Sequence, residues 1–459
     1  MLFDHFQKII LSWQEAFGQK RTALHGLKLA IGLLCTLGRR TISRSIFFFG
    51  QQHKDWSADY CLFSRAKWDP EQLFQPILEQ SLPFCKTSYL SIAFDDTKLH
   101  KTGRKIKTAS YQRDPLSPAF HVNLCYGLRF LQASLLIPLY DRDSRMPPRG
   151  FPVRFQEVPA VKKPGKRATD EQRKAYLQQK KEHNLPLEFV KMLHGVRASA
   201  DQAGASDRLI IATVDGSFCN RTVFQNRVSG TVIVARTRKD TRLCFPAEKP
   251  GRRVYGREKF SPHQVRSDEK IPWKEAKIFH GGAFRDIRYK EVNYVLWQSG
   301  AKTLPLRLIV VAPTPYWLSK KSCKLYRQVA YLLTTDTKLP IQDLIQEYFN
   351  RWQIEVNHRD EKDLLGVGQA QVRSDLSVPR QPAFVVAAYS ALLLASVMAY
   401  GPGRTDEYEP LPKWRRNAVR PSILDLLTLL RKQYVQNQMN VSRAQLQQPQ
   451  MDMIWGACA

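Results

Sequence analysis

The sequence predicts an α/β fold in which a mixed sheet, flanked by helices, is interrupted by a β-rich insertion and preceded by a helical domain. Three observations support this prediction. Apolar residues recur at helical spacing up to about residue 85, apolar runs typical of strands begin at Tyr89, and a helical pattern runs from Ile341 through Leu365. Between residues 241 and 330 the pattern is again β-like and rich in aromatic residues, so we expect this block to be inserted into the mixed sheet.

Within the first 85 residues, the basic segment GRRTISRSIF separates two runs with helical spacing. This pattern is compatible with a small helix-turn-helix-like unit that reads DNA, and equally with a helical bundle that only packs on the next domain. We assign residues 1–85 to a helical N-terminal DNA-binding domain, and residues 401–459 to a C-terminal helical and basic tail.

The charge balance predicts a polyanionic partner. The chain has 71 Lys plus Arg against 41 Asp plus Glu, a formal net charge of +30, and nucleic acid is the first candidate for such a partner. An acidic membrane surface normally requires an amphipathic basic helix or a lipidation signal, and neither is evident. The apolar stretch 383–400 is long enough for a marginal membrane span, but we expect a buried core helix. The N-terminal residues carry an acid early and lack both a long apolar core and a small-residue cleavage site, so they are a poor signal peptide. We expect a cytoplasmic, nucleoid-associated protein without a membrane partner.

Two acidic positions follow strand-like runs. YLSIAF is followed by Asp95 and Asp96, and DRLIIATV is followed by Asp215. HVNLCYGLRF and ASLLIPLYD predict two further strands of a meander, and the polar, Pro-rich stretch from RDSRMPP to ATDEQ predicts a long surface loop. RKAYLQQKKEHNLPLEFVKMLHGVRASA predicts a helix before the strand that ends at Asp215. A lone Asp at a strand end is usually a turn former or a helix cap.

The third acidic candidate lies on the helix IQDLIQEYFNRWQIEVNHRDEKDLLG. On a helical wheel, one face about 60° wide holds a phenol, cations and a single carboxylate. These residues are Tyr348, Arg351, Glu355, Lys362 and, beside them, Arg359. The face suits a metal-binding acid flanked by phosphate-holding groups, although charges at this spacing are often an ordinary salt-bridged surface.

The spacing Tyr348-(2)-Arg351-(3)-Glu355-(6)-Lys362 resembles the YREK signature of DDE-type insertion-sequence transposases, which have an RNase H-like catalytic core. The strand followed by Asp95-Asp96-Thr97 and the strand followed by Asp215 resemble the first and second catalytic acids of that family, in the same order. The resemblance implies an RNase H-like core in two parts, residues 86–240 and 331–400, with the β-rich insertion domain at 241–330.

The resemblance also implies a site of two Mg²⁺ ions, which Mn²⁺ may replace, held by Asp96, Asp215 and Glu355. Asp96 is chosen because the family pattern places the ligand directly before Thr, and strand parity agrees only weakly, so Asp95 stays an alternative. Tyr348, Arg351, Lys362 and Arg359 would contact DNA phosphates. Carboxylates are the ligands that such hard cations prefer.

Some members of this family stack a flipped base on an aromatic residue of the insertion domain. Trp297 and Trp317 are the candidates here, with plain packing in the β-domain as the favoured reading.

Two functional hypotheses remain. The first is an active transposase that binds double-stranded DNA at its own terminal inverted repeats as a homodimer, cleaves it and joins 3′-hydroxyl ends to target DNA. The second is a catalytically inactive DNA-binding descendant of the same fold. A junction resolvase is a weaker third hypothesis, because it would not require the YREK spacing.

Overall fold

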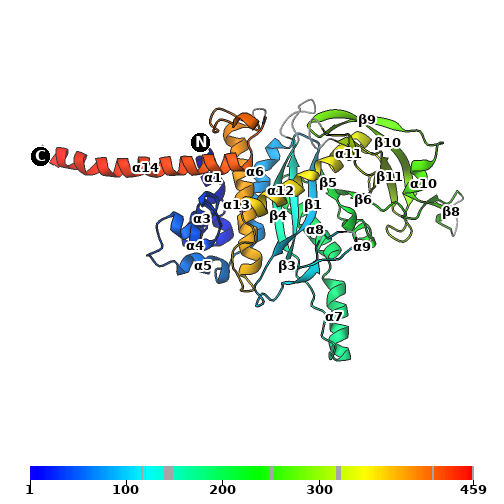
Figure 1. Ribbon diagram of the computed structural model, residues 1–459, viewed down its shortest axis with the longest axis horizontal. Helices are drawn as coiled ribbons and strands as arrows, with labels where there is room; N and C mark the ends of the chain where they lie inside the picture. Colours follow the sequence, from blue (N-terminus) through cyan, green and yellow to red (C-terminus); the bar gives the residue numbers. More distant parts are fainter. Residues whose placement is uncertain are drawn as a thin grey trace. The chain divides into compact units, whose positions relative to one another are not determined.

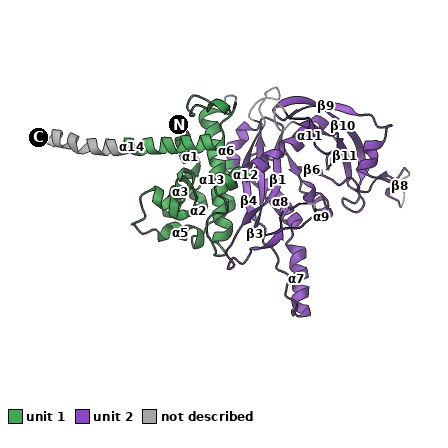
Figure 2. Ribbon diagram, viewed as in Figure 1, with its two compact units in different colours: residues 1–77, 359–459 green, residues 78–358 purple. Residues whose placement is uncertain are grey.

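The computed structural model describes residues 1–114, 117–118, 120–138, 148–248, 253–316, 322–415 and 418–456, with side chains described up to residue 440. The chain forms two compact units (Figure 2). Residues 1–77 and 359–459 form one, here called the helical unit, and residues 78–358 form the other, here called the sheet unit. The boundary at residue 358 falls within a helix, α12 (Trp352–Asp363).

The sheet unit is built on one large mixed sheet (Figure 1). In the part of the chain that is described, the strand order is β2-β3-β1-β5-β6-β14-β11-β10-β7-β8, with β4 paired to β3 and β9 paired to β10. A separate pair consists of β12 and β13. The strands are β1 (Tyr89–His100), β2 (Ser110–Arg113), β3 (Leu124–Ile137), β4 (Arg149–Glu157), β5 (Leu209–Val214), β6 (Thr231–Arg236), β7 (Leu243–Pro246), β8 (Tyr255–Phe260), β9 (Lys274–His280), β10 (Ala283–Leu296), β11 (Pro305–Val311), β12 (Pro315–Tyr316), β13 (Leu325–Tyr326) and β14 (Ala330–Thr334).

The first half of this sheet has the arrangement expected of an RNase H-like core. Strands β4, β3 and β1 form an antiparallel meander, and β5 and β6 continue from β1 in parallel. Strand β14 pairs with β6, so the chain returns to the core sheet after the β-rich block that contains β7 to β13. The predicted fold class, a mixed α/β sheet flanked by helices, is confirmed.

The meander differs from the sequence prediction in one strand. The two runs predicted as separate strands form the single strand β3, and the third strand, β4, lies in the segment that we predicted as surface loop. That prediction is wrong for 149–157, because Phe151, Val153 and Phe155 alternate at strand spacing and are buried. Pro152 is accommodated where the register between β3 and β4 shifts.

Helices cover both faces of the core sheet. On one face Phe189 of α8 packs edge-on against Phe94 of β1, with ring centroids 5.1 Å apart. On the other, Leu344 of α11 joins the cluster of Ile211 from β5 and Val232 from β6. The helices of this unit are η2 (Leu82–Phe84), α7 (Asp170–Glu182), α8 (Leu185–Gln202), η3 (Gly216–Phe218), α9 (Arg221–Gln225), α10 (Pro262–Ser267) and α11 (Ile341–Asn350); α6 (Gln75–Ser81) and α12 cross its boundaries.

Two predicted helices are interrupted. The helix predicted before β5 is divided into α7 and α8, because Asn184 caps a new start by accepting a hydrogen bond from the Leu187 backbone N–H at 3.1 Å. The helix predicted from Ile341 through Leu365 is divided at Arg351 into α11 and α12. There the Ile354 N–H bonds to the Arg351 carbonyl three residues earlier, which tightens the turn.

The helical unit combines both ends of the chain around α13 (Ser377–Tyr400). Phe384 of α13 packs against Trp13 and Phe63, with ring centroids 5.6 and 5.3 Å apart, and the Phe3 N–H donates to Gln433 Oε1 at 2.9 Å. Its helices are α1 (Leu2–Leu11), α2 (Gln14–Phe17), α3 (Lys20–Cys35), α4 (Ile42–Phe48), α5 (Ser57–Ser64), η1 (Pro70–Leu73), α13, η4 (Lys413–Arg415) and α14 (Ile423–Gly456).

By length and composition α13 is the one helix, among the residues described, that is apolar enough to cross a membrane. However, 83% of its most apolar window is buried inside the protein, as predicted for a core helix. Burial therefore accounts for its hydropathy.

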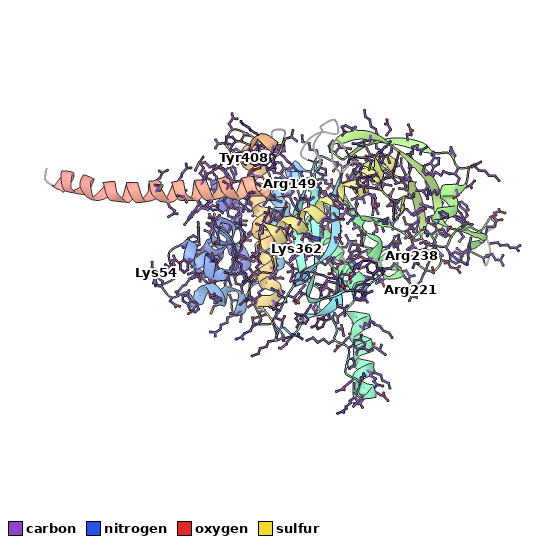
Figure 3. All side chains as sticks on the ribbon, in the orientation of Figure 1. Lys54, Arg149, Arg221, Arg238, Lys362 and Tyr408 are labelled. Carbon is purple, nitrogen blue, oxygen red and sulfur yellow. The ribbon has the colours of Figure 1, made fainter. Side chains whose placement is uncertain are left out.

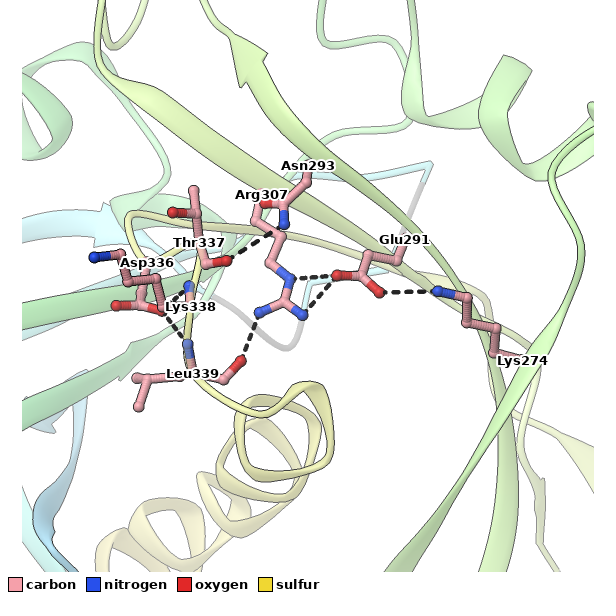
Figure 4. Close-up of polar contacts among 8 residues, drawn as sticks. All are labelled: Lys274, Glu291, Asn293, Arg307, Asp336, Thr337, Lys338 and Leu339. Carbon is pink, nitrogen blue, oxygen red and sulfur yellow. Dashed lines mark hydrogen bonds and ion pairs between the residues drawn. The ribbon is translucent and has the colours of Figure 1, made fainter.

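The β-rich block also fixes the turn that leads into α11 (Figure 4). Arg307 of β11, whose side chain is 8% exposed, donates from Nε to Glu291 of β10 at 2.7 Å and from Nη1 to the Leu339 carbonyl at 2.6 Å. Asp336 Oδ1 accepts from the backbone N–H groups of Lys338 and Leu339. A buried ion pair thus holds the turn just before α11.

We expect Glu291→Ala to destabilise the protein by about 2–3 kcal/mol, because it leaves the Arg307 guanidinium buried without its carboxylate. Chemical denaturation monitored by fluorescence measures the change. Lys274→Ala is the matched control, since Lys274 bonds to the same carboxylate at 3.4 Å but is 55% exposed, and we expect it to cost less than about 1 kcal/mol. Equal losses in the two variants would contradict this role of Arg307.

Candidate active site

The register of β1 and β5 brings two carboxylates together. These strands are parallel, and Tyr89 to Ala93 pair in order with Leu209 to Thr213. Continuing that register by two residues brings Asp95 level with Asp215, on the same face of the sheet. The two are close enough for the charge of Asp215 to affect the ionisation of Asp95. Asp215 is the N-cap of η3, and its Oδ1 accepts from the Ser217 N–H at 2.9 Å.

Asp96 faces the other side of β1. Side chains alternate along a strand, so Asp96 lies on the same side as Phe94, which packs on α8. Its Oδ2 is 3.3 Å from Nε of Arg129, which lies on the neighbouring strand β3. The structure therefore brings Asp95, the alternative left open by the sequence, next to Asp215, and places Asp96 against β3.

Arg351 joins the first acid to the third. Its Nη1 donates to Asp95 Oδ2 at 3.2 Å and its Nη2 donates to Glu355 Oε1 at 2.8 Å. The contact with Glu355 is the i, i+4 pair that the helical wheel predicts. Asp95, Arg351 and Glu355, which are far apart in sequence, thus form one bonded group beside Asp215.

The position of Glu355 depends on how α12 packs on the meander. Ile354 is fully buried in a cluster with Ala93 of β1 and Leu136 of β3. One turn later, Asn357 accepts from Ser134 at 3.0 Å and donates to the Gly150 carbonyl of β4 at 3.0 Å. A Cβ at Gly150 would lie 2.5 Å from Asn357 Oδ1, so a larger residue there would displace the Asn357 side chain. These contacts hold α12 on the face of Asp95.

The ionisation of Asp95 reflects this crowding. Burial raises the pKa of Asp95 to about 7, with further raising by the Asp215 and Asp96 carboxylates, while Arg351 works in the opposite direction. The Asp95 side chain is only 18% exposed. A cation placed beside Asp95 and Asp215 would offset this repulsion.

A buried carboxyl that the sequence reasoning missed anchors α11 on the same face. Glu347 lies within hydrogen-bond distance of the Ser91 hydroxyl and accepts from the Tyr89 hydroxyl at 3.1 Å, both on β1. Burial raises the pKa of Glu347, and its hydrogen bonds from Ser91, Asn350 and Tyr89 oppose that shift. Its place one turn before Arg351 was the available signal. Glu347 thus joins the last turn of α11 to β1, at Tyr89 and Ser91.

Tyr348 and Arg351 also line a pocket of about 520 Å³ beside the carboxylates. Arg236 and Trp352 contribute to its walls, and the Arg327 guanidinium lies 5.7 Å from the Trp352 ring centroid. The pocket is thus cationic and aromatic, as expected for groups that contact DNA phosphates and bases. Arg221 and Arg238, on the same unit, are further exposed cations (Figure 3).

Arg359 and Lys362 lie on later turns of α12, after His358, where the sheet unit ends. Both are exposed. The Arg359 guanidinium bonds to the neighbouring Asp360 at 2.9 Å; Figure 3 labels Lys362 on the same helix.

Trp297 follows β10 and packs edge-on against Phe224 of α9, with ring centroids 5.5 Å apart. Its ring also fills the space where a Cβ at Gly300 would stand. These contacts are those of a packing residue. Trp317 lies outside the described residues.

The carboxylates of Asp95, Asp215 and Glu355 suit a hard cation, but they do not surround a common metal-binding position. Among the residues described, no three His, Cys, Asp or Glu side chains converge closely enough to hold an ion. The Arg351 guanidinium instead bonds to oxygens of both Asp95 and Glu355. Carboxylate oxygens are nevertheless the ligands that magnesium and manganese prefer.

The mixed sheet, with one carboxylate on β1 level with another directly after β5, defines an α/β fold of the RNase H-like type. Residues 14–303 match the family described as DDE superfamily endonuclease. Because the match covers well over half of the chain, the protein belongs to that family, which indicates a nuclease or transposase enzyme. The match includes both strand acids and ends before the helix of Glu355. No curated protein matches the chain.

The raised pKa of Asp95 predicts a pH-dependent cost to folding. The folded protein retains this proton up to about pH 7, whereas the unfolded chain releases it near pH 4. Stability is therefore lost as the pH rises between these values. Asp95→Asn removes the loss, so without divalent cations its melting temperature should exceed that of the wild type by about 2 °C or more at pH 8, and by less at pH 5. Differential scanning fluorimetry measures this.

The exposed Asp240 of the same unit, with a side chain that is 61% exposed, provides the control Asp240→Asn. A constant difference between wild type and Asp95→Asn from pH 5 to pH 8 would show that the Asp95 carboxyl is not crowded as described.

Proposed function

We propose that the protein is a DDE transposase. It binds the terminal inverted repeats of its own insertion sequence as a homodimer, cleaves the DNA and joins 3′-hydroxyl ends to target DNA. Family membership supports the coarser assignment to nucleases and transposases. The observation that carries the finer one is that Arg351 bonds to both Asp95 and Glu355, while Asp215 lies level with Asp95 on the same face of the sheet.

In this proposal Asp95, Asp215 and Glu355 hold two Mg²⁺ ions, for which Mn²⁺ can substitute. When bound, such ions activate the attacking oxygen and stabilise the leaving oxygen of the phosphodiester. The ligand set differs from the sequence expectation in one residue, since Asp95 takes the place of Asp96. The reason is geometric: Asp95 shares the sheet face of Asp215, and Asp96 does not.

Arg351 has two successive roles in this proposal. Without cations it neutralises the crowded carboxylates, and a carboxylate oxygen bonded to guanidinium is not free to hold a cation. Once released, its planar group suits forked contacts to a phosphate of the scissile strand. Tyr348, beside it in the same pocket, and Lys362 and Arg359 further along α12 complete the proposed phosphate contacts.

The same arginine favours the second candidate function, a DNA-binding protein without catalysis. If Arg351 never releases Asp95 and Glu355, the carboxylates remain paired and DNA is bound but not cut. The localisation that we propose, cytoplasmic and nucleoid-associated, is common to both candidates.

Glu355→Gln should leave DNA binding intact and reduce cleavage by at least about a hundredfold, because a neutral amide is a poor ligand for a hard cation. The substrate is duplex DNA carrying the inverted repeats that flank the coding sequence, with Mg²⁺, Mn²⁺ or EDTA. Gel shift measures binding and denaturing gels measure cleavage. Cleavage by this variant at the wild-type rate would remove Glu355 from the site, and absence of wild-type cleavage with both metals would favour the non-catalytic candidate.

A matched pair of variants tests which of the two neighbouring acids, Asp95 or Asp96, is the metal ligand. Asp95→Asn should abolish Mg²⁺-dependent cleavage, whereas Asp96→Asn should retain it within about tenfold, the lower range for a group behind the ligands. Melting curves establish that both variants are folded. The reverse result would return the first ligand to Asp96, as the family pattern predicts.

A further inference from the structure

The helical unit contains a groove of about 890 Å³ that is separate from the carboxylates. Three segments line it: residues 39–47, which lead into and form α4; residues 60–64 of α5; and residues 370–377, which lead into α13. We call it the arginine groove, after Arg39, Arg44 and Arg373 on its walls.

A buried arginine holds two of these walls together. Arg40, which is 7% exposed, donates from Nη1 to the carbonyls of Leu33 and Leu34 and from Nε to the Leu364 carbonyl at 2.6 Å. Its backbone N–H donates to Gln369 Oε1 at 3.1 Å. These bonds join the loop before α4 to the segment before α13, so the groove is part of the folded core and not a gap between loose ends.

The third wall is fixed in the same way. Asp59 of α5 is buried and bonds to Lys28 of α3 at 2.6 Å and to His25 at 3.0 Å. The Arg380 guanidinium of α13 donates to the Ala66 carbonyl just beyond α5 at 2.7 Å. The next residue on α5, Tyr60, is therefore presented at the groove by a rigid support.

The lining has the chemistry of a nucleotide site. Its described residues include three arginines and several hydroxyl groups, and they contain no Asp or Glu. Two aromatic side chains in the lining are solvent-accessible, Phe47 at 64% and Tyr60 at 41%. Arginine provides forked contacts to phosphates, and exposed rings provide surfaces on which bases stack.

The combination favours a single strand over a duplex. Within a duplex the base faces are covered by their neighbours, so only phosphates and base edges are presented. Rings inside a groove contribute to binding only if a base face is free. We propose that the arginine groove binds single-stranded DNA, with phosphates on Arg39, Arg44 and Arg373 and bases on Phe47 and Tyr60. This site is independent of the carboxylates and of any metal.

The test measures binding to a fluorescein-labelled oligothymidylate by anisotropy, with the full chain carrying Glu355→Gln, in EDTA. Tyr60→Ala should weaken binding at least about fivefold, while Tyr60→Phe retains it, because stacking needs only the ring. Arg373→Ala should weaken binding and reduce the slope of log K against log salt by about 0.7, the value for one phosphate of a single strand. Arg21→Ala, an exposed arginine of α3 outside the groove, is the matched control and should bind as the parent does.

Wild-type affinity and salt slope in both Tyr60→Ala and Arg373→Ala, with melting curves unchanged, would overturn the proposal. A hairpin duplex of the same length is measured in parallel. If the two variants lose affinity for the duplex alone, the groove holds paired DNA and the proposal is equally wrong. No cleavage enters this assay, so its outcome is distinguishable from failure of the transposase proposal.

Discussion

The parallel pairing of β1 with β5 places two carboxylates level with each other, and the rest of the site depends on how their charge is compensated. Asp95 and Asp215 lie on one face of the sheet, where burial and mutual repulsion raise the pKa of Asp95 to about 7. Such a pair is stable only with a proton, an arginine or a cation beside it. Here Arg351 provides the positive charge, and it also takes up Glu355. The carboxylates are therefore stabilised by positive charge beside them, a property that suits the binding of metal cations in a nuclease site.

The rest of the sheet unit holds Arg351 and Glu355 at that position. Glu347 attaches the last turns of α11 to β1, and Asn357 attaches α12 to β3 and β4. The β-rich block contributes at a distance, because its Arg307–Glu291 pair fixes the turn that precedes α11. The β-rich block is thus joined to the start of α11, the helix that precedes the helix of the third acid. Trp297, in the same block, packs against Phe224.

The helical unit is held together by packing around one apolar helix and by the bonds of a buried arginine. Both ends of the chain pack around the apolar helix α13, and the bonds of Arg40 join segments that are more than three hundred residues apart. That arrangement gathers arginines from 39–44 and from residue 373 around one groove. The large positive charge of the chain is in this way partly organised into a surface of defined shape. In the proposed binding of single-stranded DNA, this charge gives salt-dependent affinity and the aromatic residues add selectivity for exposed bases.

From the sequence alone, local and periodic features were predictable: the mixed α/β class, the strand that leads to Asp95 and Asp96, the strand that leads to Asp215, and the helical face of Tyr348, Arg351 and Glu355. These depend on periods of two and 3.6 residues and on neighbouring side chains. Tertiary structure decided what depends on distant partners. The register of β1 against β5 selects Asp95 as the neighbour of Asp215, the pairing with β3 makes a strand of 149–157, and the contact of Glu347 with Ser91 joins α11 to β1. A period of two places Asp95 and Asp96 on opposite faces but does not say which face the third acid covers, because that is determined by packing between segments far apart in the chain.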